Sequence, residues 1–154
     1  MMRGENPNAV LFVCTMNAVR SPMAAALLEN LLGEGARVDS VGVEAGELDP
    51  LAVEVMKEIG IALSSHQPRC LEVLGPDSYD LVVTLSGEAQ RRMESAVHGG
   101  RLEYWPVGDP TGVEGSREQR LAAYRAVRDE LLNKLKARFQ MVGPAAREAG
   151  EQVQ

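Results

Sequence analysis

Apolar residues along this chain form continuous runs at some places and helical repeats at others. The segments 9–15 and 79–85 contain continuous apolar runs, which are typical of strands buried on both faces of a parallel sheet. Two further strands are predicted at 37–43 and 101–105. Between the strands, apolar residues recur three or four positions apart, and this period predicts helices.

Residues that favour helix ends mark where these helices begin. Ser21 is predicted as the cap of the first helix, because serine is favoured there and a proline follows it. Further helices are predicted to begin at Asp49, Ser86 and residue 117, and the last one runs as a long amphipathic helix to Phe139. The second helix is expected to turn an apolar face inward, made of Leu51, Val55, Met56 and Ile59.

Strands that alternate with helices predict an α/β fold, a doubly wound four-stranded parallel sheet with helices on both faces. The 154 residues contain no repeat and no linker, so we expect a single domain over 1–154. Its core is predicted at 9–139, with flexible ends at 1–8 and 143–154. Sheets of this kind bind ligands where their strands end, and the first strand ends near Cys14.

The composition argues against several classes of function. A net charge of −6 argues against a nucleic-acid partner, which usually requires a basic face. No apolar run reaches the roughly 18 residues that cross a bilayer, and the polar N-terminus lacks a signal-peptide pattern, so no membrane association is expected. The two cysteines and two isolated histidines have no metal-ligand spacing. We therefore expect a reduced cytoplasmic protein without a metal or cofactor.

The segment CTMNAVRS, residues 14–21, joins the first strand to the first helix. A loop wrapped at this point aims backbone N–H groups and the positive end of a helix at one spot, which suits an anion. Arg20 can add two parallel hydrogen bonds to a tetrahedral oxyanion. The same field stabilises a thiolate, so Cys14 is predicted to be a nucleophile whose sulfur Ser21 can hydrogen-bond. Asn17 tolerates the left-handed backbone that such a loop needs.

The stretch VLFVCTMNAVRSPMA resembles the phosphate-binding loop of low-molecular-weight protein tyrosine phosphatases and of the arsenate reductases built on their fold. The resemblance covers most of the chain and includes DSVGVEAG, GIALSSHQPR, DLVVTLSGEA and the Asp-Pro of GDPTG. It implies a flavodoxin-like fold with Cys14 as nucleophile, Arg20 as phosphate clamp and Asp109 as general acid. The phosphate-binding loop would consist of Thr15, Met16, Asn17, Ala18, Val19, Arg20 and Ser21. A polar network that shapes the loop would consist of Asn17, Ser21, Ser40 and His66.

The assignment of Asp109 also follows from the chemistry. Displacement by a thiolate leaves an alkoxide or phenolate that needs a proton, and a carboxylic acid across the pocket can supply it. Asp109 follows the last short strand, and Pro110 favours an extended backbone at Asp109. The alternative for Asp109 is a plain turn residue, because Asp-Pro is a common turn pair. The alternative for His66 is a solvated loop histidine.

Several departures from the phosphatase pattern bear on the subtype. Thr111 stands where a tyrosine often follows the Asp-Pro pair, so phosphotyrosine peptides are not favoured. Val19 stands where many of the phosphatases carry a second cysteine. The stretch DLVVTLSGEAQRRMES resembles a reductase segment with two redox cysteines, but Ser86 and Met93 occupy those places. Only Cys70 remains as a second thiol, and we expect it to be a buried bystander.

The sequence thus predicts phosphomonoester hydrolysis through a phosphocysteine, on a phosphorylated protein or a small aryl phosphate. One alternative is arsenate reduction, in which Cys14 attacks arsenate and an external low-molecular-weight thiol replaces the missing cysteines. Another alternative is a phosphate- or partner-binding module without turnover. The presence of both Cys14 and Asp109 argues against that module, because binding alone needs neither a nucleophile nor an acid.

Overall fold

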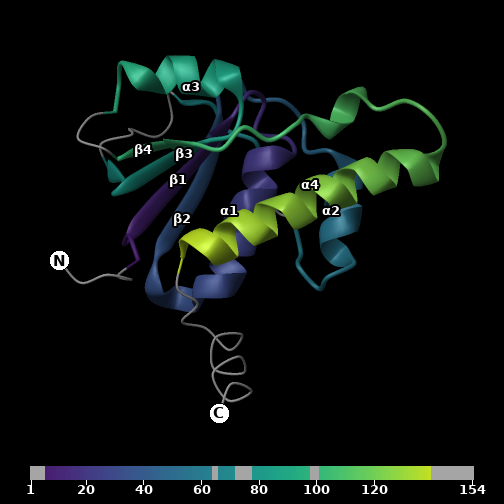
Figure 1. Ribbon diagram of the computed structural model, residues 1–154, viewed down its shortest axis with the longest axis horizontal. Helices are drawn as coiled ribbons and strands as arrows, with labels where there is room; N and C mark the ends of the chain where they lie inside the picture. Colours follow the sequence, from purple (N-terminus) through teal and green to yellow (C-terminus); the bar gives the residue numbers. More distant parts are fainter. Residues whose placement is uncertain (1–5, 64–65, 72–77, 98–100, 140–154) are drawn as a thin grey trace, which may run out of the picture.

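The fold is built on one parallel sheet, shown in Figure 1. The computed structural model describes residues 6–63, 66–71, 78–97 and 101–139. The sheet has the order β2-β1-β3-β4, and its strands are β1 (Ala9–Cys14), β2 (Arg37–Gly42), β3 (Leu81–Thr84) and β4 (Leu102–Tyr104). All three pairings are parallel, and each strand lies within its predicted range. The four-stranded parallel sheet is therefore confirmed.

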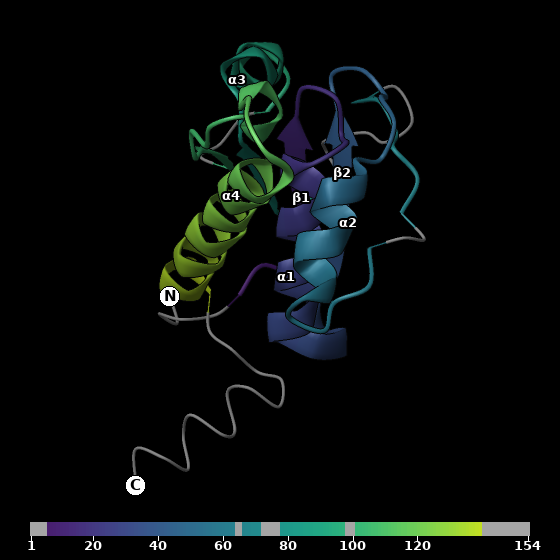
Figure 2. The ribbon, with the colours of Figure 1, turned by 90° about the vertical axis from the view of Figure 1, so that its right-hand side faces the viewer.

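Helices cover both faces of the sheet, as Figures 1 and 2 show. The helices are α1 (Arg20–Leu32), α2 (Pro50–Lys57), α3 (Gly87–Glu94) and α4 (Arg117–Arg138). Helix α3 lies on one side of the sheet, and the other three helices lie on the opposite side. This arrangement confirms the predicted doubly wound α/β fold. The segments 1–5 and 140–154, which include most of the predicted flexible ends, lie outside the described residues.

The central strand β1 shows why continuous apolar runs fit this fold. Val10 and Phe12 face the layer of α1 and α4, whereas Leu11 and Val13 face the layer of α3. All four side chains are fully buried, since both faces of the sheet are covered. Burial of such a side chain contributes about 1.5–3 kcal/mol to stability. Within the described ranges, no helix is both long and apolar enough to pass through a membrane.

Two details of the predicted helices are wrong. Helix α1 begins at Arg20 with Val19 as its N-cap, and no side chain caps it; Ser21 is not the cap because its hydroxyl is used elsewhere in the site. Helix α2 ends at Lys57, so Ile59 lies beyond it and is 42% exposed rather than inward-facing. The predicted caps Asp49 of α2 and Ser86 of α3 are both confirmed, because each side chain accepts a backbone N–H.

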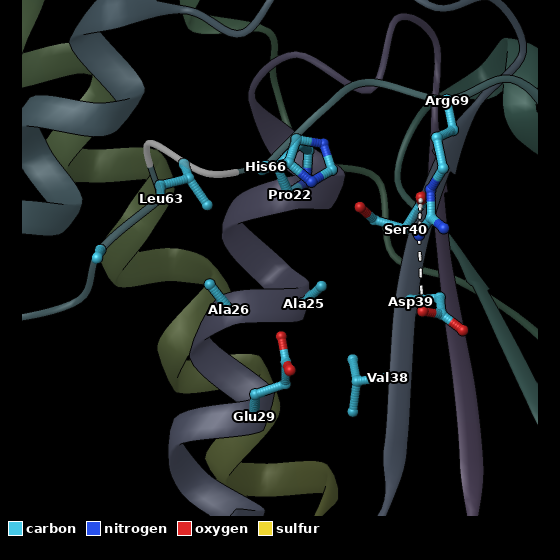
Figure 3. A pocket seen from close by; sticks show the side chains of 11 residues that line it. Pro22, Ala25, Ala26, Glu29, Val38, Asp39, Ser40, Leu63, His66 and Arg69 are labelled. Atoms are coloured by element: carbon cyan, nitrogen blue, oxygen red, sulfur yellow. Dashed lines mark hydrogen bonds and ion pairs between the residues drawn. The ribbon is translucent and has the colours of Figure 1, made fainter.

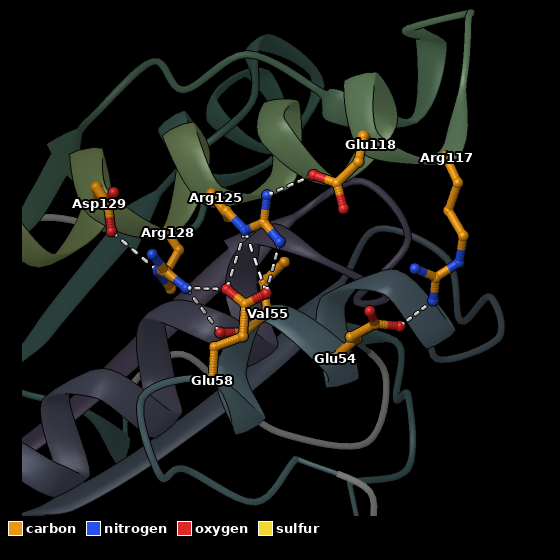
Figure 4. Close-up of polar contacts among 8 residues, drawn as sticks. All are labelled: Glu54, Val55, Glu58, Arg117, Glu118, Arg125, Arg128 and Asp129. Carbon is orange, nitrogen blue, oxygen red and sulfur yellow. Dashed lines mark hydrogen bonds and ion pairs between the residues drawn. The ribbon is translucent and has the colours of Figure 1, made fainter.

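Charged side chains fasten α4 to α2, as Figure 4 shows. The Glu58 carboxylate accepts hydrogen bonds from Arg125, at 2.8 Å from Nη2, and from Arg128, at 2.9 Å from Nη1. The hydrogen bonds from Arg125 are the main cause that lowers the pKa of Glu58 from 4.5 to about 2. Tyr124 of α4 also donates a hydrogen bond of 2.5 Å to Asp49, the cap of α2. The arginines thus hold the end of α2, and Tyr124 holds its start, where the Asp49 N–H also donates to Ala18 of the loop after β1.

Candidate active site

The loop between β1 and α1 wraps around the sulfur of Cys14, the last residue of β1. Asn17 has a φ of 55°, the left-handed conformation predicted for it, and this turns the chain back toward Cys14. The backbone N–H of Asn17 donates to Cys14 Sγ at 3.3 Å, and Ser21 Oγ lies 3.0 Å from the same sulfur. These two contacts hold the sulfur at the centre of the loop, beside the N-terminus of α1.

The amide side chain of Asn17 holds the loop in shape. Its Nδ2 group donates to Ser21 Oγ at 2.7 Å and to Ser40 Oγ at 3.0 Å. Its Oδ1 atom accepts the backbone N–H of Arg69 at 2.8 Å and contacts His66 Nε2 at 3.1 Å. Burial lowers the pKa of His66, and a neutral ring fits here with Nε2 as the donor. The structure therefore brings together the four residues of the predicted network and adds the backbone of Arg69.

The segment after β2 braces the loop through its carbonyl groups, a feature that the sequence analysis did not find. Backbone N–H groups of this segment donate to four loop carbonyls: Val43 to Cys14 at 3.0 Å, Glu44 to Thr15 at 2.9 Å, Gly46 to Met16 at 2.8 Å and Asp49 to Ala18 at 3.2 Å. Gly42 makes this approach possible, since a Cβ atom there would lie 2.7 Å from the Asn17 nitrogen. The one available signal was this glycine near the end of the second predicted strand, 37–43.

Arg20 and Asp109 face the same small hollow as Cys14. Arg20 Nη1 donates to the carbonyl of Val107 at 2.9 Å, and its Nη2 lies 3.9 Å from Asp109 Oδ2. Asp109 has the extended backbone predicted for it, with φ −87° and ψ 115°. The hollow measures about 80 Å³ and is lined by Cys14, Met16, Ala18, Val19, Arg20, Asp109 and Thr111. A thiol, a guanidinium and a carboxyl group, far apart in the sequence, therefore meet at one cavity.

The two positions that resemble reductase cysteines serve the packing of α3. Ser86 Oγ accepts a hydrogen bond of 3.0 Å from Thr15 Oγ1 and caps α3 by accepting the N–H of Ala89. The Met93 side chain is buried against the sheet. Cys70 was predicted to be buried, but it is partly exposed. It lies in a short β-bridge beside Gly42 instead of in the core.

A second hollow of about 290 Å³ lies behind the loop, between α1 and β2, and Figure 3 shows it. Its polar lining includes Glu29, Asp39, Ser40, His66 and Arg69. Burial, and then the nearby Asp39 carboxylate, raise the pKa of Glu29. Cys14 does not line this hollow, whereas two residues of the polar network, Ser40 and His66, do. Among the described ranges, no three His, Cys, Asp or Glu residues gather in a way that could hold a metal ion.

Comparisons with known proteins agree on one family. The family model for low molecular weight phosphotyrosine protein phosphatase matches residues 9–147. The arsenate reductase of Bacillus subtilis (strain 168) is 37% identical over 127 residues, which are 82% of this chain and 91% of that protein. A solved arsenate reductase in the phosphate-binding state is similar with a TM-score of 0.74 and 30% identity, covering 84% of this chain and 95% of its own. The solved structure of a low molecular weight protein tyrosine phosphatase from T. tengcongensis is similar with a TM-score of 0.71 and 30% sequence identity. This match covers 83% of this chain and 95% of that one.

The match to the family model spans all four strands of the sheet and helices α1 to α4. The comparisons confirm the predicted fold and the prediction of a cysteine-dependent enzyme, either a phosphatase or an arsenate reductase. The chain therefore belongs to the low molecular weight phosphotyrosine protein phosphatase family.

Proposed function

We propose that this protein hydrolyses phosphomonoesters through a phosphocysteine formed on Cys14, without a metal ion or cofactor. The observation that carries the proposal is the convergence of Cys14, Arg20 and Asp109 on one hollow about 80 Å³ in volume. A hollow of this size suits a single tetrahedral oxyanion, with the rest of the substrate outside its mouth. The phosphoryl oxygens would be bound by the backbone N–H groups of the loop and by the Arg20 guanidinium.

In the first step, the Cys14 thiolate attacks phosphorus and the S–P bond forms. The P–O bond to the leaving group breaks, and its oxygen takes the proton of the Asp109 carboxylic acid. Ser21 supports the thiolate, since its hydroxyl lies 3.0 Å from the sulfur. Its single proton can go either to Cys14 Sγ or to the carbonyl of Val41, at 3.3 Å.

In the second step, water attacks the phosphorus of the phosphocysteine. The Asp109 carboxylate accepts a proton from that water, the S–P bond breaks, and the electron pair returns to Cys14 as a thiolate. Inorganic phosphate is released, and the enzyme is restored without any change of oxidation state. The chemistry therefore uses one cysteine and one carboxyl group, and a reduced cytoplasmic setting would keep Cys14 available.

Reduction of arsenate is the second candidate, and the arsenate reductases among the relatives favour it. Here Cys14 would attack arsenic and displace water. An external thiol such as glutathione would then attack the Cys14 sulfur, and the As–S electron pair would leave with arsenic as arsenite. A second thiol would reduce the mixed disulfide and restore Cys14. This route takes both electrons from the external thiols.

A relay within the chain does not fit the positions of its two cysteines. Cys14 pairs with Gly42 across β1 and β2, and Gly42 pairs in turn with Cys70. Neighbouring strands are about 4.8 Å apart, so the Cα atoms of the two cysteines are roughly twice that distance apart. A disulfide requires Cα atoms within about 7 Å. This spacing argues against a relay through Cys70, so arsenate reduction would depend wholly on external thiols, whereas hydrolysis needs no further thiol at all.

The deciding experiment compares the two reactions on one preparation. Hydrolysis of an aryl phosphate is measured beside reduction of arsenate with thioredoxin, glutathione or mycothiol. Cys14→Ser should abolish both reactions while phosphate still binds, and Cys70→Ser is the matched control that should keep hydrolysis at the wild-type rate. Unchanged hydrolysis by Cys14→Ser would rule out the proposal. Arsenate turnover with an external thiol, in the absence of any hydrolysis, would make the second candidate the function.

A further inference from the structure

The two oxygens of the Asp109 carboxylate have different surroundings. Oδ1 accepts two hydrogen bonds from Thr111, one from its backbone N–H at 3.0 Å and one from its hydroxyl at 2.8 Å. Oδ2 is the oxygen nearer to Arg20, at 3.9 Å from Nη2. Thr111 thus holds one side of the carboxylate and leaves the other side toward the guanidinium and the hollow.

This clamp matters because the Asp109 side chain is 53% exposed, so neighbouring groups enclose it only in part. An aspartate rotates broadly about its last torsion, and this rotation exchanges its two oxygens. Pro110 restricts the backbone of Asp109 but does not restrict that torsion. The backbone N–H of Thr111 holds Oδ1 from one direction. The hydroxyl holds the same oxygen from a second direction, so an exchange of the two carboxylate oxygens must break two hydrogen bonds instead of one.

The clamp also decides where a proton can sit. A carboxyl oxygen has two lone pairs, and the two bonds from Thr111 engage both lone pairs of Oδ1. A proton on Oδ1 would have to displace one of these donors. A proton on Oδ2 displaces none, so the acid form of Asp109 carries its proton on the oxygen that faces the reacting group.

We propose that Thr111 is a positioning residue, whose hydroxyl keeps Oδ2 of Asp109 turned toward the leaving oxygen. This inference rests on the proposed function. As the S–P bond forms and the P–O bond breaks, the proton moves from Oδ2 to the leaving oxygen. When water later attacks and the S–P bond breaks, Oδ2 receives a proton from that water. Thr111 makes and breaks no bond to the substrate, and acts only through Asp109.

The test compares Thr111→Val, which has nearly the same shape but no hydroxyl, with Thr111→Ser, which keeps the hydroxyl. Both keep the backbone N–H, and the exposed position tolerates either side chain. The rate of phosphocysteine formation is measured in single turnovers with phenyl phosphate, whose leaving group is poor, and with 4-nitrophenyl phosphate, whose leaving group is good. Thr111→Val should slow the first substrate about tenfold, a part of the 10²–10⁴ typical of acid catalysis, and the second much less. Thr111→Ser should recover most of the rate, and inhibition by inorganic phosphate should be unchanged in both variants.

Three outcomes would overturn this role: an equal loss on both substrates, no loss on either, or a Thr111→Ser variant as slow as Thr111→Val. Each of them leaves the proposed function standing if the wild-type protein forms the phosphocysteine. If the wild-type protein forms none from either substrate, the proposed function fails, and the role of Thr111 fails with it.

Discussion

Gly42→Ala tests whether the segment after β2 shapes the loop between β1 and α1, where phosphate is proposed to bind. An added Cβ at this position would lie 2.7 Å from the backbone nitrogen of Asn17 and 2.8 Å from the carbonyl carbon of Met16. The carbonyl oxygen of Glu44 would be closer still. Real Cβ atoms essentially never come within 3.0 Å of such atoms, and backbone cannot move aside as the end of a side chain can. The loop or the segment that braces it must therefore shift.

The size of the effect follows from these contacts. Overpacking of this kind destabilises a protein by about 1–3 kcal/mol, and three backbone neighbours place Gly42→Ala toward the upper end. A displaced loop also loses the alignment of its N–H groups toward the anion. One misdirected hydrogen bond to a charged group is worth about 1.5–3 kcal/mol, or roughly a 10- to 100-fold weaker affinity for phosphate.

Gly87→Ala is the matched control for this variant. A Cβ there would be 3.5 Å from Arg91 Nη1 and 3.7 Å from the Tyr104 hydroxyl, which are ordinary contacts. Gly87 is the first residue of α3, where alanine is the better helix former, so the control should be neutral or slightly stabilising. Urea unfolding measures stability, and titration calorimetry with inorganic phosphate measures affinity. If Gly42→Ala equals wild type in both, the brace does not shape the loop.

Other predictions concern the acid, the second thiol and the clamp between helices. Asp109→Asn should slow attack on poor leaving groups by about 10²–10⁴ and on good ones much less; a uniform loss in single turnovers would make Asp109 a structural turn residue. Thioredoxin alone should not sustain arsenate reduction, and repeated turnovers that vanish in Cys70→Ser would refute the argument from strand spacing. Glu58→Gln should lower the free energy of unfolding at pH 7, because its folded-state pKa of about 2 lies below the unfolded 4.5. The difference in unfolding free energy between wild type and Glu58→Gln should shrink as pH falls from 4.5 toward 2, and also at high salt. If denaturant titrations show the same difference under all these conditions, the ion pairs with Arg125 and Arg128 do not stabilise the fold.

Much of the fold could be predicted because the responsible signals are local. The continuous apolar run of β1 is buried from both sides, so its pattern alone identifies a central strand. Asp49 and Ser86 cap helices through bonds to residues two or three positions along the chain. The left-handed backbone of Asn17 likewise depends on its own side chain. Cys14 and Arg20 meet for the same reason, since a single loop joins them.

The features that were missed depend on partners distant in the sequence. Ser21 looks like a helix cap by its neighbours, but the Asn17 amide and the Cys14 sulfur, which the loop folds onto it, take its hydroxyl instead. The brace after β2 joins backbone groups of that segment to backbone groups of the loop after β1. Backbone contacts of this kind leave no signal in the residue types except at Gly42. Ile59 was predicted to face inward because the apolar period of the sequence continues to that residue, but the helix itself ends at Lys57.

The four hydrogen bonds of the brace also bear on how quickly the site exchanges its ligand. Because the peptide unit is planar and trans, a carbonyl held outward turns the N–H of the same peptide unit inward. An arriving oxyanion thus meets a finished cradle and need not wait for the loop to fold. We expect inorganic phosphate to enter without a slow conformational step, while its rate of departure is set by its affinity for the cradle. If the protein hydrolyses phosphomonoesters as proposed, the phosphate that it releases would compete with fresh substrate for this same preformed cradle.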